Sequence, residues 1–201
     1  LPATSGPPWP TPLAAAAYHG PIGDLVRALE PHSESDPAAL LVQSLVAFGS
    51  AVGRNAYYQV EGSKHYPNLV ATLVGKTAAG RKGTSWGRIE DTFAAIAPNW
   101  KEHCIASGLS SGEGLIHAVR DEVTKQEPVR DKGFNGRQRN GPITGYESVL
   151  VDPGVKDKRL LCTESEFGGV LRVMQRQSNT LSVLIRQCWD TGNLRTLTKN
   201  N

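Results

Sequence analysis

The feature that most constrains the fold of this chain is an uninterrupted apolar run that leads into a glycine-rich, cationic turn. The run covers Asn68–Val74 and the turn covers Gly75–Ser85. An apolar run without polar alternation is typical of a strand covered on both faces, as in a parallel sheet. Ile89, Phe93 and Ile96 then recur at helical spacing. The order of strand, glycine turn and helix predicts an α/β fold with a parallel sheet flanked by helices.

Length and composition narrow the class of protein. The chain has 201 residues, 39% of them hydrophobic, which is enough for a globular domain with its own core. Its net charge of +3 is mildly basic and permits a nucleic-acid surface without establishing one. No stretch approaches about 18 uninterrupted apolar residues, which argues against a membrane span. The three cysteines are too scattered for a disulfide framework or a zinc site, and no secretion signal opens the chain, so we expect a cytoplasmic protein.

The two ends of the sequence predict a fragment of a longer protein. It begins at Leu1 without a methionine and stops at Asn201 directly after structured-looking sequence. We divide it into a proline- and alanine-rich linker over 1–20, a helical and short-strand segment over 21–66, and an α/β core over 67–201.

Local signals predict the remaining elements. Asp36 before Pro37 is typical of a helix start, and the helical spacing that follows ends at Gly53. We expect strands over 57–61, 103–106 and 159–163, a helix opened by a capping box at Ser110–Glu113, helical sequence through 170–185, and a flexible loop over 125–147.

The turn has the parts of a phosphate-binding loop. Glycines let backbone amides approach phosphate oxygens, the following helix presents its positive end, and a lysine reaches the terminal phosphates. We assign Lys82 as that lysine and Thr84 as the magnesium-binding hydroxyl, with Arg81 and Ser85 as their alternatives, because the spacing departs from the usual pattern. The other interpretation is a turn whose cations merely face water. The expected nucleotide-binding residues are Gly75, Gly80, Arg81, Lys82, Gly83, Thr84 and Ser85.

Two acids complete the predicted site. Glu164 and Glu166 close the predicted strand at 159–163, and alternation sends both to the same side. We assign Glu164 to the metal and Glu166 to the base that polarises water, although the two roles could be exchanged. The alternative interpretation is a pair of solvated carboxylates at a strand end.

The predicted loop over 125–147 carries a basic cluster. Phe134 lies among these cations, a content that suits contact with single-stranded DNA. A solvated surface loop is the alternative. The cations of the cluster are Arg130, Lys132, Arg137 and Arg139.

A family resemblance is carried by seven segments over about residues 18–201. The most specific of them is the turn that ends in Thr84 and Ser85. Together they resemble the 3987 family of domains of unknown function, RecA-like ATPase domains that are often joined to primase-polymerase modules. In chain order the segments are Tyr18–Asp24, Glu30–His32, Leu45–Gly49, Gly80–Ser85, Gly108–Gly114, Val119–Asp121 and Glu164–Phe167.

The resemblance implies a RecA-like P-loop NTPase core that binds ATP and Mg²⁺ at the residues assigned above. It also implies a homo-oligomer that works on DNA and an upstream primase-type domain. We find fewer strands than such a core needs, so we expect a core truncated at its C-terminus, with its sensor strand and arginine finger beyond Asn201.

These observations leave three hypotheses about function. The first is the ATPase domain of a replicative helicase or primase-helicase, in which Lys82 and Mg²⁺ spread charge while Glu166 orients the attacking water. The second is a non-catalytic DNA-binding or scaffolding segment with a vestigial nucleotide site. The third is a small P-loop phosphotransferase, suggested by Lys82–Thr84.

Overall fold

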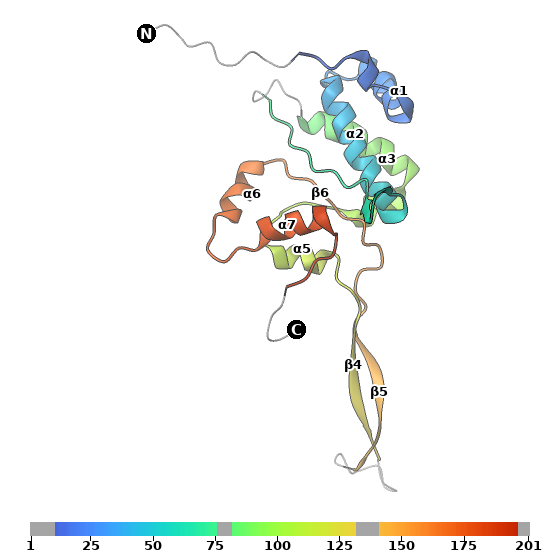
Figure 1. The fold of residues 1–201 in the computed structure, drawn as a ribbon, viewed down its shortest axis with the longest axis vertical. Coiled ribbons are helices and arrows are strands. Elements are labelled where there is room, and N and C mark those ends of the chain that lie inside the picture. The colour runs from blue at the N-terminus through green and yellow to red at the C-terminus, as the bar shows by residue number, and fades with distance from the viewer. Residues whose placement is uncertain (1–10, 76–81, 132–140, 197–201) are drawn as a thin grey trace. The chain divides into compact units, whose positions relative to one another are not determined.

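The computed structural model describes residues 11–75, 82–131 and 141–196 (Figure 1). These residues form a mixed α/β structure, 48% helix and 16% strand, in which each sheet has two strands. The chain divides into two compact units, Leu1–Ala106 and Ser107–Asn201. The division falls at 106/107, and the boundaries predicted at 20/21 and 66/67 stay predictions.

The first unit is mainly helical. Asp36 caps its longest helix, since its side chain accepts a hydrogen bond from the backbone N–H of Ala38 at 2.8 Å, and Pro37 takes the first helical position, as predicted. The helices are α1 (Gly20–Leu29), α2 (Pro37–Val52), α3 (Lys82–Ile96) and α4 (Pro98–Cys104), with short 3₁₀ turns at Ala15–Ala17, Glu30–His32 and Gly53–Asn55.

The core of the first unit forms where α2 packs against α1 and α3, and α3 against α4. Trp100 is its largest fully buried side chain, and the ring of Phe93 lies 5.8 Å from the Trp100 ring. The other buried apolar side chains are Val26, Leu40, Leu41, Ala47, Ile89 and Cys104.

A short hairpin and a short strand complete the first unit. Strands β1 (Tyr58–Val60) and β2 (Ser63–His65) pair antiparallel, which confirms a strand within 57–61. The strand expected over 103–106 is shorter than predicted: residues 103 and 104 end α4, and only β3 (Ile105–Ala106) is extended.

The second unit packs three helices around one apolar cluster. Ser111 caps α5 (Gly112–Ala118), because its Oγ accepts from the N–H of Gly114 at 3.0 Å, as the capping box predicted. The other elements are β4 (Val123–Arg130), β5 (Ile143–Asp152), β6 (Leu161–Cys162), α6 (Phe167–Met174) and α7 (Leu181–Asp190), and the buried cluster consists of Leu115, Val170, Leu181 and Leu184.

Gly112 permits the close packing of α5 on α7. A Cβ atom at this position would lie 2.3 Å from Leu184 Cδ1 and 2.3 Å from Thr180 Oγ1. Any side chain here would have to displace the side chains of Leu184 and Thr180, so glycine is the residue that fits without rearrangement.

The loop expected over 125–147 is wrong for most of its described residues, since 125–130 and 143–147 lie in strands. β4 and β5 form a twisted antiparallel ribbon that Figure 1 shows as two long paired arrows. All eight residues of β4 are exposed, and seven of the ten in β5. Charged residues and glycines are typical of loops, which is why the sequence predicted one here. The pairing between the two strands determines the structure instead.

The strand expected over Asn68–Val74 is not formed among the described residues. Residues 68–75 have no strand pairing, and Val70 and Val74 are 71% and 82% exposed. The apolar run indicated a preference for burial, but a central strand also needs a neighbour on each side to satisfy its backbone. No described segment supplies those neighbours.

One described stretch meets the length and composition of a membrane span. Pro37–Asn55 is 19 residues long with a mean hydropathy of 1.2. Its residues Leu40, Leu41 and Ala47 are buried in the core of the first unit, and a core helix passes the same test. The sequence argued against a membrane span. Among the described residues, Pro37–Asn55 nevertheless meets the length and composition of one.

Candidate nucleotide site and neighbouring surfaces

The helix predicted after the glycine turn begins at Lys82 and runs to Ile96 as α3. Gly80 and Arg81 lie outside the described residues, and Gly75 precedes that gap without strand structure. The start of α3 is therefore the described part of the predicted phosphate loop.

The first turn of α3 carries the two hydroxyls that the sequence offered as alternative magnesium ligands, Thr84 and Ser85, and they differ in exposure. Gly83 and Thr84 are exposed, whereas Ser85 is fully buried on the face that also buries Ile89 and Phe93. A ligand that approaches the start of α3 from solvent would reach Thr84 rather than Ser85. In general, the first turn of a helix carries backbone N–H groups without intrahelical partners and the positive end of the helix dipole.

Glu164 lies two residues after β6, in the second unit, and is half-buried. Its Oε1 atom accepts hydrogen bonds from the backbone N–H groups of Gly108 and Leu109, both at 2.6 Å. These two bonds hold the carboxylate in one orientation. Charge-assisted bonds of this kind are stronger than neutral ones.

Glu166 lies in a different setting. It is exposed and directly precedes α6, and its side chain makes no capping hydrogen bond to that helix. β6 ends at Cys162, so strand alternation does not extend to Glu164 and Glu166. The two halves of the predicted site thus belong to different units, Gly75–Ser85 to the first and the two glutamates to the second.

Of the basic cluster, the structure describes Arg130. Arg130 closes β4, and its guanidinium donates to the carbonyl of Gly141 at 3.1 Å. The N–H of Asp131 donates to the carbonyl of Pro142 at 3.0 Å, which extends the pairing beyond the strands. Lys132, Arg137 and Arg139 lie outside the described residues.

The root of the ribbon is held by ion pairs. Arg120 Nε donates to Asp152 Oδ2 at 2.7 Å, and the N–H of Gly154 donates to Asp152 Oδ1 at 2.8 Å. The hydrogen bond from Arg120 and then that from Gly154 lower the pKa of the Asp152 carboxyl. Lys158 Nζ lies 2.9 Å from Asp121 Oδ1 in the same region.

A cluster of tyrosines and cations around the β1–β2 hairpin was missed by the sequence reading. The guanidinium carbon of Arg54 lies 3.7 Å from the centre of the Tyr66 ring, and Lys64 Nζ lies 4.3 Å from the centre of the Tyr57 ring. The rings of Tyr57 and Tyr66 are 5.8 Å apart. The available signal was the density of tyrosine, since Tyr57, Tyr58 and Tyr66 are three of only five in the chain.

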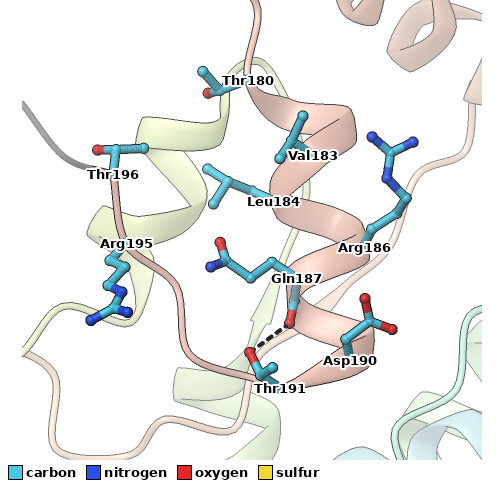
Figure 2. Close-up of a pocket in the computed structure, with 9 residues that line it drawn as sticks. All are labelled: Thr180, Val183, Leu184, Arg186, Gln187, Asp190, Thr191, Arg195 and Thr196. Carbon is cyan, nitrogen blue, oxygen red and sulfur yellow. Dashed lines mark hydrogen bonds between the residues drawn. The ribbon is translucent and has the colours of Figure 1, made fainter.

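A shallow cavity of about 510 Å³ lies beside α7 (Figure 2). Leu184 and Gln187 point toward the segment that carries Arg195, whereas Arg186 and Asp190 lie on the other side of the helix. The two arginines therefore do not converge on one point, and the cavity offers no ready anion site.

Comparison with known proteins yields no relative, because no family model, curated protein or solved structure matches this chain. The family resemblance therefore stays a prediction.

Proposed function

We propose that this chain is the ATP-binding and ATP-hydrolysing part of a DNA replication protein of the helicase or primase-helicase type, with a RecA-like core. The observation that carries the proposal is the start of α3 at Lys82, directly after the glycine segment, with Gly83 and Thr84 exposed and the opposite face fixed in the core. A rigid helix with an open first turn is the part of a phosphate loop that binds oxygen anions.

The residues present suit the chemistry of a magnesium nucleotide. Thr84 offers a hydroxyl oxygen, and Glu164 offers a carboxylate whose orientation is fixed by two backbone bonds. Hard oxygen ligands of this kind are the ones that Mg²⁺ prefers. Mg²⁺ would neutralise charge on the β- and γ-phosphates, Lys82 would do the same from the turn, and exposed Glu166 would orient the attacking water.

We also propose the substrate polymer, the oligomeric state, the upstream domain and the location that belong to this function. DNA is the polymer acted on, the whole protein assembles as a homo-oligomer, an upstream primase-type domain precedes this chain, and the protein works in the cytoplasm.

ATP binding and phosphate release, each measured with and without single-stranded DNA, test the proposal. Lys82→Ala should reduce turnover about a hundredfold, because it removes one preorganised cation from the transferring phosphate. Lys156→Ala is the matched control, since it removes an exposed lysine of the other unit. Equal turnover in the two variants, or no ATP binding by the unmodified chain, would overturn the proposal.

A second candidate function is DNA binding without turnover, and the ribbon favours it. Two exposed strands flank the basic cluster in the sequence, and cations of this kind pair with backbone phosphates. Replacing Arg137 and Arg139 by alanine should weaken DNA binding and lower its salt dependence by about 0.7 per lost phosphate contact on a single strand. Unchanged affinity in that double variant would exclude Arg137 and Arg139 as DNA contacts.

A further inference from the structure

The β1–β2 hairpin and its flanks carry a surface that the proposed ATP site does not use. We name it the tyrosine platform and define it as Arg54, Tyr57, Lys64 and Tyr66. All but Tyr66 are exposed, and Tyr66 is half-buried. We propose that the tyrosine platform binds single-stranded nucleic acid by stacking bases on its rings and pairing phosphates with its cations.

The register of the hairpin places the two tyrosines and the lysine of the platform on one face. Tyr58 pairs with His65, and Gln59 pairs with Lys64. Because side chains alternate along a strand, Tyr57, Lys64 and Tyr66 share one face, and Tyr58 lies on the other. The ring contact between Tyr57 and Tyr66 agrees with this assignment.

The cations are held beside the rings rather than spread into solvent. Arg54 covers one side of the Tyr66 ring and Lys64 covers one side of the Tyr57 ring. Such contacts orient both the positive charge and the aromatic plane. The face that holds Tyr57 is therefore ordered before any ligand arrives.

Burial does not explain why this hairpin is aromatic. Tyr58 is 73% exposed and Tyr57 is 48% exposed. All six strand residues are exposed, so the rings contribute little to a core. A single exposed tyrosine is common on a surface, but Tyr57 and Tyr66 contact each other and each has a cation over its ring, which forms a surface suited to a flat, anionic ligand.

Single-stranded nucleic acid has the matching chemistry. Each unpaired base presents a flat face that can stack on tyrosine or on an arginine plane, and each phosphate can pair with a nearby cation. Residues 54–67 contain Arg54 and Lys64 against one acid, Glu61, so the local charge favours a polyanion. A duplex hides its base faces inside the stack and would lose the aromatic contacts.

The test measures binding of a fluorescent oligo(dT) of about a dozen nucleotides, in the absence of ATP. Tyr57→Ala should weaken binding about tenfold, whereas Tyr57→Phe should keep it, because phenylalanine retains the stacking face. Lys64→Ala should weaken binding and reduce its salt dependence. Phe167→Ala is the matched control, since it removes an exposed aromatic ring from the second unit.

The outcomes separate this inference from the proposed ATP site. Lys82→Ala should lose ATP turnover and still bind oligo(dT), because the tyrosine platform contains no residue of the phosphate loop. An oligo(rU) arm shows whether the platform accepts RNA as well as DNA. Oligo(dT) affinity that is unchanged in Tyr57→Ala, or equal affinity for a duplex of the same length, would overturn the inference whatever the result with ATP.

Discussion

Glu164 accepts a hydrogen bond from the backbone N–H of Gly108, with Oε1 2.6 Å from the nitrogen, and the same oxygen accepts from Leu109. The carboxylate of Glu164 thereby links the segment that follows β6 to the loop that leads into α5. A glutamate assigned to a metal from its place after a strand is thus also an anchor for a distant segment of backbone.

Two substitutions at Glu164 separate these roles. Glu164→Ala leaves two backbone donors without this acceptor and should lower the free energy of unfolding by about 1.5–3 kcal/mol. Glu164→Gln keeps a carbonyl oxygen for the same donors, so it should cost less in a urea titration. If the carboxylate also binds magnesium, Glu164→Gln should abolish magnesium-dependent ATP binding while the protein stays folded. Unchanged magnesium dependence in Glu164→Gln would leave the residue an anchor only.

The ribbon should loosen in acid at its root. Arg120 and the N–H of Gly154 lower the pKa of Asp152, so the folded chain favours the ionised carboxyl more than the unfolded chain does. The stabilisation is present above the unfolded pKa, roughly 3.9, and is lost as pH falls through the lower folded value. Amide hydrogen exchange in β4 and β5 should therefore accelerate across this range.

Asp152→Asn serves as the control for that experiment. The amide keeps an oxygen for the N–H of Gly154 but carries no charge to pair with Arg120. Exchange in the ribbon of this variant should show no acid transition of its own. A transition at the same pH in both proteins would show that another group is responsible.

Helix starts were predictable because their determinants are local. Asp36 and Ser111 each accept a hydrogen bond from a backbone N–H within three residues, so the information lies in a few consecutive letters. α3 was predictable for a similar reason, since its buried positions Ser85, Ile89 and Phe93 repeat every four residues.

The strands were less predictable because their partners lie elsewhere in the chain. In the ribbon, Glu127 lies directly opposite Glu147, a like-charge pair that no local strand signal would favour. Asn68–Val74 shows the converse, an apolar run with strand character but without pairing among the described residues. The tyrosine platform was missed because Arg54 and Tyr66 are twelve positions apart and meet only when the hairpin forms.

Trp100 should be the side chain of the first unit that is most costly to remove. It is fully buried, and its indole N–H donates to Ser50 Oγ at 3.0 Å, which links α4 to α2. Trp100→Ala should lower the free energy of unfolding by about 3–5 kcal/mol, because it opens a cavity that the helices cannot fill. Circular dichroism in a urea titration measures this loss.

Ser50→Ala isolates the hydrogen bond from the packing. It leaves the indole N–H of Trp100 without this acceptor, at a cost of about 1–3 kcal/mol, while the ring stays in place. The loss should therefore be smaller than in Trp100→Ala. Equal losses would mean that the position of the ring depends on the hydrogen bond itself.

Cys162 should react slowly in the folded protein. Burial, then the neighbouring Cys188, then Glu164 raise the pKa of its thiol to about 11. The thiolate is the reactive form and an unperturbed thiol has a pKa near 8.5, so alkylation by iodoacetamide at pH 8 should be about a hundredfold slower than in urea. Peptide mapping by mass spectrometry follows each cysteine separately.

The same thiol should make stability depend on pH. The stability gained by keeping the thiol protonated is present below the unfolded pKa and declines as pH rises toward 11. Cys162→Ala should remove the decline in stability between pH 8.5 and 11 that this thiol contributes. Equal alkylation rates at Cys162 in buffer and in urea would contradict the packing of this β6 residue against the apolar cluster of the second unit.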